Sequence, residues 1–82
     1  MNNKLGAYVK ERRLKLNKKQ EEMTSTDATS ISRIERGLRF PGENLMRFLC
    51  EELDLDIKKM RRLKVQDKIS NLKDEMVAMK RG

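Results

Sequence analysis

The chain has 82 residues, of which 40% are charged and 37% hydrophobic, with 20 Lys and Arg against 13 Asp and Glu. A chain of this length forms one small domain, because it buries only about 60% of its unfolded surface. The net charge of +7 favours polyanionic partners, with nucleic acid ahead of an acidic membrane. A strongly solvated surface is the alternative explanation of the same charge.

Histidine and cysteine, two residue types common in catalytic and metal sites, are missing or nearly so. The sequence has no histidine and a single cysteine, Cys50, which excludes an internal disulfide and a cysteine–histidine zinc site. Cys50 lies among Phe48, Leu49 and Leu53, as a small buried thiol does. Without an imidazole base or a glycine-rich phosphate loop, we expect no enzyme and no cofactor. No segment resembles a signal peptide or a membrane span, so we expect a cytoplasmic protein.

Apolar residues recur at helical spacing along nearly the whole chain, and the alternation typical of strands is missing. We therefore predict an all-α fold of five helices. The first helix is expected over residues 4–16, where Leu5, Val9 and Leu16 share one face.

A short second helix is expected to begin at Asn17, as its N-cap, and to end near Thr24, with Met23 turned inward. Asn17 and Gln20 stand three residues apart, as in a capping box. The following segment TSTDATS is rich in turn and cap residues, and in it Asp27 is the best N-cap for a third helix.

The third helix should point Ile31 and Ile34 inward and end at Gly37 in the left-handed conformation. Pro41 and Gly42 predict that LRFPG is a loop.

A fourth helix is predicted over residues 43–53, and Asp56 is expected to cap a final helix over residues 57–80. The inward residues of the fourth helix are expected to be Met46, Leu49, Cys50 and Leu53. In the last helix, steps of 4, 3, 4 and 3 form a heptad seam, made by Val65, Ile69, Leu72, Met76 and Met79. We expect this seam to form a homodimer; packing back onto its own domain is the alternative.

The segments LGAYVKERRLKLNKKQEEM and SISRIERGLRFPGENLMRFLCEELDL together resemble the lambda-repressor-like, Xre/Cro-type helix-turn-helix domain. The resemblance covers about residues 4–57, so residues 1–57 are interpreted as a DNA-binding domain and residues 58–82 as a C-terminal dimerisation helix. Its most specific residues are Gly6, Val9, Arg13, Gln20, the motif ISRIERG at 31–37, Pro41, Leu49, Leu53 and Leu55.

The resemblance implies sequence-specific binding of double-stranded DNA, with the third helix in the major groove. The family's base-reading positions fall on Ala28, Thr29, Ser32 and Arg33. Arg33 could donate two hydrogen bonds to a guanine, whereas a solvated helix face is the alternative explanation of these side chains.

Two further groups follow from the resemblance. Contacts to the DNA phosphates fall on Asn17, Lys18, Lys19, Gln20, Arg36 and Arg39. Arg13 and Glu35 match a pair that forms an internal salt bridge in the family. Lys58, Lys59, Arg61, Arg62 and Lys64 form a further basic cluster that faces either phosphate or solvent.

The turn between the second and third helices departs from the family pattern. The interval from Gln20 to Glu35 is about three residues shorter, TSTD replaces the usual glycine-containing turn, and Lys18 stands where an aliphatic residue is usual. We expect the hydroxyls or the carboxylate of TSTD to satisfy the turn's backbone groups. A shorter turn changes the angle at which the third helix is presented, so we expect it to alter the base contacts more than the phosphate contacts.

We therefore expect a dimeric transcriptional regulator, with repression favoured over activation. The alternative is a helix-turn-helix-derived module that binds another protein, such as a regulator or a toxin. The altered turn and the exposed seam favour this alternative.

Overall fold

The computed structural model describes the backbone of residues 3–81 and the side chains of residues 3–72. Within these residues the regular elements are all helical: α1 (Lys4–Lys15), the 3₁₀ turn η1 (Gln20–Glu22), α2 (Ala28–Glu35), α3 (Glu43–Leu53) and α4 (Ile57–Arg81). The all-α prediction is confirmed. The expected second helix is reduced to η1, so four α-helices are present in this part of the chain instead of five.

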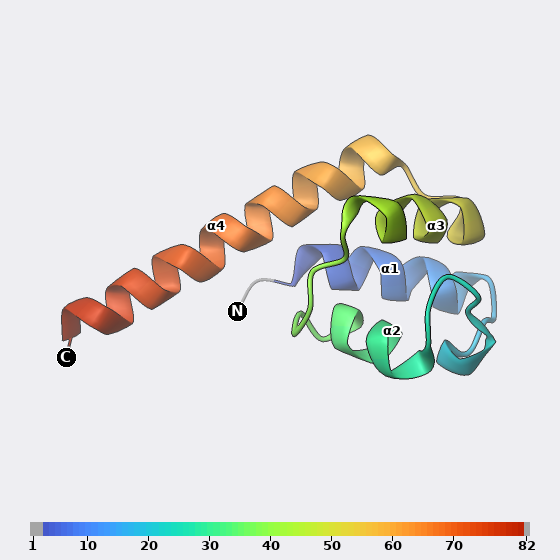
Figure 1. Cartoon of the computed structure of the whole chain (residues 1–82), viewed down its shortest axis with the longest axis horizontal. Coiled ribbons are helices and arrows are strands. Elements are labelled where there is room, and N and C mark those ends of the chain that lie inside the picture. Colours follow the sequence, from blue (N-terminus) through green and yellow to red (C-terminus); the bar gives the residue numbers. More distant parts are fainter. Residues whose placement is uncertain (1–2, 82) are drawn as a thin grey trace.

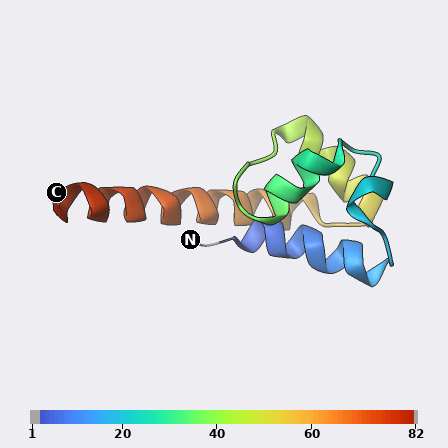
Figure 2. The same cartoon turned by 90° about the horizontal axis from the view of Figure 1, so that it is seen from below.

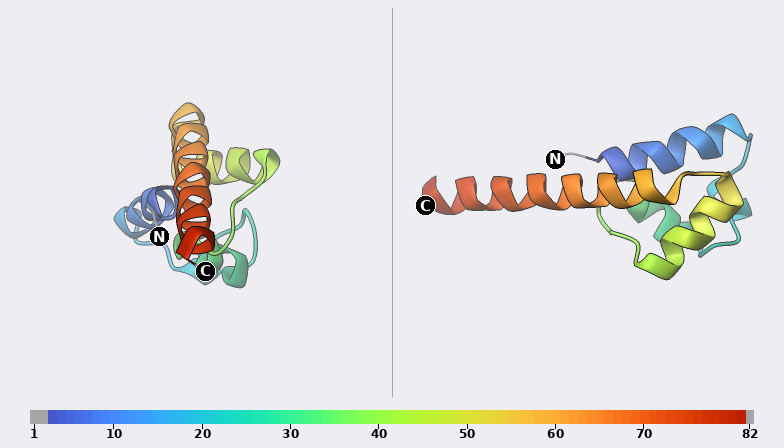
Figure 3. Two further views of the ribbon diagram at one scale, coloured as in Figure 1. Left: turned by 90° about the vertical axis from the view of Figure 1, so that its left-hand side faces the viewer. Right: turned by 90° about the horizontal axis from the view of Figure 1, so that it is seen from above.

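The first three α-helices form a body, residues 3–56, in which α1 contacts α2 and α3 and also packs against α4 (Figure 1). α4 then continues past the start of α1 and leaves the body (Figure 2, Figure 3). Its residues 69–81, which follow the contact of Lys68 with the Phe40 ring, are here called the arm. No helix among the described residues combines the length and the apolar character needed to cross a membrane.

The core lies where the inward faces of the four α-helices meet. The predicted residues Ile31 and Ile34 are 0% and 1% exposed, and α3 has the predicted bounds. Cys50 is half-buried against this core. The buried hydrophobic residues are Leu5, Val9, Met23, Ile31, Ile34, Met46, Leu49, Leu53, Leu55 and Met60.

The end of α1 differs from the prediction. Leu16 is 48% exposed and does not share the inward face of Leu5 and Val9. Asn17 has φ +54° and its N–H donates to the carbonyl of Leu14, so it ends α1 and does not cap the next helix. Asparagine suits both positions, because it tolerates the left-handed conformation as well as N-capping.

η1 is capped by the residues beside it. Lys19 is its N-cap residue, and the Lys19 N–H donates to the carboxylate of Glu22 at 3.1 Å. The capping interaction therefore involves Glu22, and the predicted box between Asn17 and Gln20 is wrong. Met23 follows η1 and is buried, as expected.

α1 and α2 approach each other closely at Gly6. A Cβ atom at this position would lie 2.5 Å from the carbonyl oxygen of Ile34 and 2.6 Å from that of Glu35. Glycine is therefore required by the space between the two helices. α2 ends as predicted, with Gly37 at φ +75° and the Leu38 N–H bonded to the carbonyl of Arg33.

α4 is fixed to α1 by a buried carboxylate. Asp67 is 1% exposed, and its two oxygens accept the backbone N–H groups of Lys4 and Leu5 at 3.1 and 2.9 Å. These donors belong to the first turn of α1, where no partner within the helix is available. Nearer its start, α4 is capped by the Asp56 carboxylate through the Lys58 N–H, as predicted.

Candidate nucleic-acid interface

α2 places the four predicted base-reading residues on or beside its exposed side. Asp27 is the N-cap residue, as predicted, and Ile31 and Ile34 fix the inward face. Thr29 and Arg33 are exposed, and since they stand four residues apart they are neighbours on the helix surface. The other two predicted positions, Ala28 and Ser32, are half-buried at the edges of this surface.

The arginines of this region differ in how they are held. Within the described part of the chain, the exposed guanidinium of Arg33 has no carboxylate partner. Arg36 is exposed and its Nε lies 3.4 Å from the carbonyl oxygen of Ser32. Arg39 donates to the Ser30 hydroxyl at 2.7 Å, which places its guanidinium beside α2. The region therefore presents three cations within seven residues.

The predicted salt bridge between Arg13 and Glu35 is present and joins α1 to α2. Arg13 Nε and Nη2 donate to the two oxygens of Glu35 at 2.7 and 2.9 Å, and both side chains are buried. Hydrogen bonding to Glu35 raises the pKa of Arg13 above its ordinary value. Arg13 also donates to the carbonyl of Lys18, and Gln20 donates to Glu35, so the same pair holds η1. This network sets the position of η1 and α2 relative to α1.

The shortened turn is organised by Glu52 of α3. The Glu52 carboxylate accepts the backbone N–H groups of Thr24 and Ser25 at 2.8 and 3.0 Å, and the Ser25 hydroxyl at 2.6 Å. It also pairs with Lys18 at 2.8 Å. Burial alone would raise the pKa of Glu52, but these four donors outweigh burial and lower the pKa to about 2.

Glu52 thereby corrects the prediction that residues of the TSTD segment satisfy this turn by themselves. It also explains Lys18, which stands at an expected aliphatic position and becomes half-buried as the partner of a carboxylate. A lysine at a position expected to be apolar was the signal, although the sequence did not indicate which acid it meets.

The predicted phosphate-binding residues before α2 are not equivalent. The side chains of Lys18 and Gln20 are bound to Glu52 and Glu35 inside the body. Asn17 and Lys19 are exposed. Of the four predicted phosphate-binding residues that precede α2 in the chain, these two are therefore the exposed ones.

Positive charge is concentrated on α4. Residues 1–56 contain 11 Lys and Arg and 10 Asp and Glu, whereas residues 57–82 contain nine and three. Three of the α4 cations contact the body: Lys59 and Lys68 lie 4.7 and 5.8 Å from the centres of the Tyr8 and Phe40 rings, and Arg61 pairs with Glu43. The body itself is almost neutral, and α4 carries most of the net charge.

The predicted dimer seam is open to solvent where the structure describes it. Val65, Ile69 and Leu72 are 56%, 49% and 58% exposed. These three residues do not pack back onto the domain. Met76 and Met79 lie outside the residues whose side chains are described.

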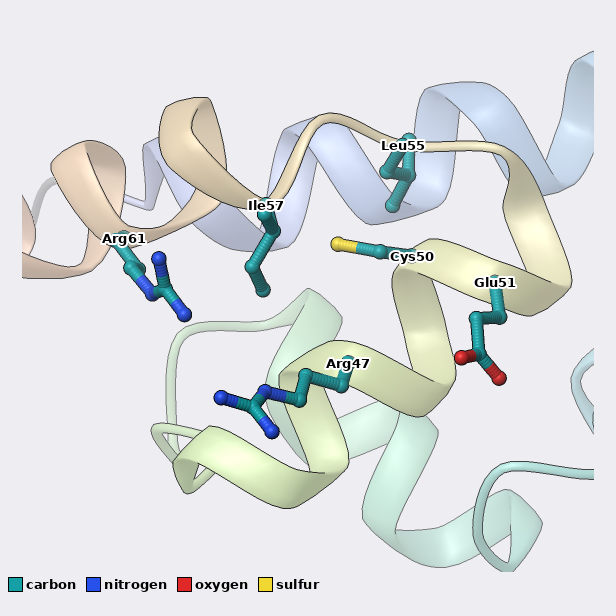
Figure 4. A pocket seen from close by; sticks show the side chains of 6 residues that line it. All are labelled: Arg47, Cys50, Glu51, Leu55, Ile57 and Arg61. Carbon is teal, nitrogen blue, oxygen red and sulfur yellow. The ribbon is translucent and has the colours of Figure 1, made fainter.

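A shallow cavity of about 290 Å³ lies between α3 and the start of α4 (Figure 4). Cys50, Leu55 and Ile57 supply its apolar lining, and Arg47 and Arg61 stand at one end. Both arginines lie beside Glu43, which partly neutralises them. Burial raises the pKa of the Cys50 thiol, which keeps it protonated near neutral pH and a poor nucleophile.

Comparison with protein-family models gave no match, and searches of curated proteins and of solved structures also found no similar protein.

Proposed function

We propose that this protein is a dimeric, sequence-specific double-stranded DNA-binding protein of the lambda-repressor-like helix-turn-helix type. α2 is the recognition helix, and the protein acts in the cytoplasm as a transcriptional regulator, with repression favoured and no catalytic role. The observation that carries this proposal is the outward polar side of α2. Thr29 and Arg33 project from it, while Ile31 and Ile34 fix the opposite side in the core.

Arg33 is assigned the main base contact, because an arginine can donate two hydrogen bonds to guanine O6 and N7. Its exposure and its lack of a carboxylate partner among the described residues leave these donors available. Thr29 lies one turn earlier and contacts the neighbouring base. Ala28 and Ser32, at the edges of this surface, contribute smaller contacts.

Phosphate contacts are assigned to Arg36 and Arg39 after α2 and to Asn17 and Lys19 before η1. These residues lie on the two sides of the recognition helix along the chain, which suits contacts to the backbone on both sides of a groove. Lys18 and Gln20 support the same region indirectly, because their side chains bind Glu52 and Glu35.

The test begins with selection of bound sites from random duplex DNA, followed by titrations of wild type, Arg33→Ala and Arg47→Ala. Arg47 is an exposed arginine of α3, so its removal changes the net charge equally but leaves α2 intact. We expect Arg33→Ala to lose preference at one base pair, by about 1–3 kcal/mol, and Arg47→Ala to keep the wild-type motif. Wild-type binding without any preferred sequence, or an unchanged motif for Arg33→Ala, would contradict the assignment.

A second candidate function is a protein-interaction module that binds another regulator or a toxin. The near-neutral body favours it, because a body with 11 cations and 10 acids gives little long-range attraction to phosphate. The salt dependence separates the two candidates. DNA binding that weakens steeply between 50 and about 200 mM salt supports the first, and salt-insensitive binding to a protein supports the second.

A further inference from the structure

The outer face of α4 carries an apolar stripe that its own body cannot cover. At 3.6 residues per turn, Val65, Ile69 and Leu72 lie on one side of the helix, roughly opposite Met60 and Asp67. Met60 and Asp67 are 0% and 1% exposed because they face the body. An intramolecular partner for the stripe would therefore have to reach the far side of α4.

The spacing of this stripe fits a second α-helix. Val65, Ile69 and Leu72 stand at steps of four and three, and the sequence continues the same spacing to Met76 and Met79. This is the periodicity with which two supercoiled helices keep their apolar residues in contact. The arm also projects beyond the body, so a partner helix can lie beside it without meeting the first three helices (Figure 1).

Charge along α4 selects the direction of that partner. Residues 57–68 carry a net charge of +5, whereas residues 69–82 carry +1. Within the first segment the single acid, Asp67, is buried against α1 and cannot face a partner. Two parallel copies would place the two +5 segments side by side, and the like charges of neighbouring helices would repel each other. Two antiparallel copies place each +5 segment beside the +1 segment of the other copy.

We infer that α4 pairs with α4 of a second copy in antiparallel orientation, with Ile69 of one copy against Leu72 of the other. The pairing rests on the dimeric state proposed above, but it does not depend on DNA binding. In this register Val65 lies opposite Met76 of the second copy. The two bodies lie on opposite sides of the crossing point, each with its own α2.

Disulfide trapping distinguishes the two orientations, starting from Cys50→Ser to remove the single native thiol. Val65→Cys and Met76→Cys are prepared separately, then oxidised alone and as a mixture. In the antiparallel register, two copies of residue 65 are separated by 11 residues of helix, or about 16 Å, too far for a disulfide. We expect the mixture to give the mixed disulfide, identified by its mass, and each variant alone to remain largely unlinked.

Several outcomes would overturn the inference. Efficient linking of Val65→Cys with itself indicates parallel pairing. A protein that sediments as a monomer at about 100 μM and gives no link shows that another partner or solvent covers the stripe. Lys10→Cys, an exposed position on α1, mixed with Met76→Cys controls for random collisions. DNA titrations of the same samples report separately on the proposed function, since a monomer can still bind one half-site.

Discussion

Glu52 gives the sharpest test of how this fold is held, because one carboxylate supports the turn that precedes the proposed recognition helix. Replacing it in Glu52→Gln removes the negative charge while keeping the size of the side chain. In the wild type the donors share two carboxylate oxygens, whereas the amide of the variant has only one oxygen that can accept. Its NH₂ group would face Lys18 and Ser25, which are themselves donors. The variant should therefore unfold more easily.

The magnitude follows from the pKa. The pKa of Glu52 lies at about 2 in the folded protein against an ordinary value of 4.5. At about 1.4 kcal/mol per pKa unit, this difference corresponds to at most roughly 3–4 kcal/mol of stability at neutral pH. Lys18 is 31% exposed, so solvent screens its share of the interaction. We expect a loss of about 2 kcal/mol, which lowers the Tm by roughly 8–16 °C.

The assay is urea denaturation of wild type, Glu52→Gln and Glu51→Gln from pH 7 to pH 2. Glu51 is the exposed neighbour and undergoes the same chemical change, so it controls for net charge. The pKa of Glu52 is lowered on folding, so its contribution is complete above pH 4.5 and decreases as the pH falls toward 2. The difference in free energy of unfolding between wild type and Glu52→Gln should therefore shrink as the pH falls from 4.5 to 2. A gap below about 0.5 kcal/mol at pH 7, or one that persists unchanged at pH 2, would refute the reasoning.

Three other substitutions test the remaining supports. Gly6→Ala should lower the free energy of unfolding by more than about 2 kcal/mol, because the new Cβ would press on the carbonyl oxygens of α2. Gly42→Ala is the control: its Cβ enters open space, so the same urea titration should show little change in stability. Arg13→Met should cost about 3–5 kcal/mol by leaving the Glu35 carboxylate buried without its partner, and a loss below about 1 kcal/mol would show that the pair is not needed. Asp67→Ala should release the first turn of α1, with hydrogen exchange increasing at the amides of residues 4 and 5 ahead of those in α3; equal exchange in both places would contradict the capping role.

The parts of the fold that sequence could predict are those set by local signals. The sequence predicts α3 with its observed bounds, because Pro41 and Gly42 break the chain before it and Met46, Leu49 and Leu53 repeat at helical spacing. The inward positions of Ile31 and Ile34 followed from the same periodicity. The end of α1 could not be fixed in this way, since Asn17 is equally suited to begin one helix and to end another.

The acids that hold the body could not be placed from sequence, because their partners are distant along the chain. Glu52 binds donors 27 and 28 residues away, and Asp67 binds donors 62 and 63 residues away. Asp67 did leave a signal, since it stands seven residues after Met60 on the packed side of α4, where an apolar residue is expected. A polar residue within an apolar stripe therefore indicates that its side chain is buried against a hydrogen-bond partner. Only the structure shows which residue that partner is.

Asp67 also links the stability of the body to the surface of α4. Its carboxylate is satisfied by the first turn of α1 and is removed from the helix surface, so it neutralises none of the six cations between Lys58 and Lys68. Glu43 of the body partly neutralises Arg61, and the charged side chains that the segment itself exposes are all cations. In a parallel pair, residues 57–68 of both copies lie side by side and their positive charges repel. In an antiparallel pair, residues 57–68 of one copy lie beside residues 69–82 of the other, which carry less net charge. The same buried contact that fixes α4 to α1 thus favours one direction of pairing over the other.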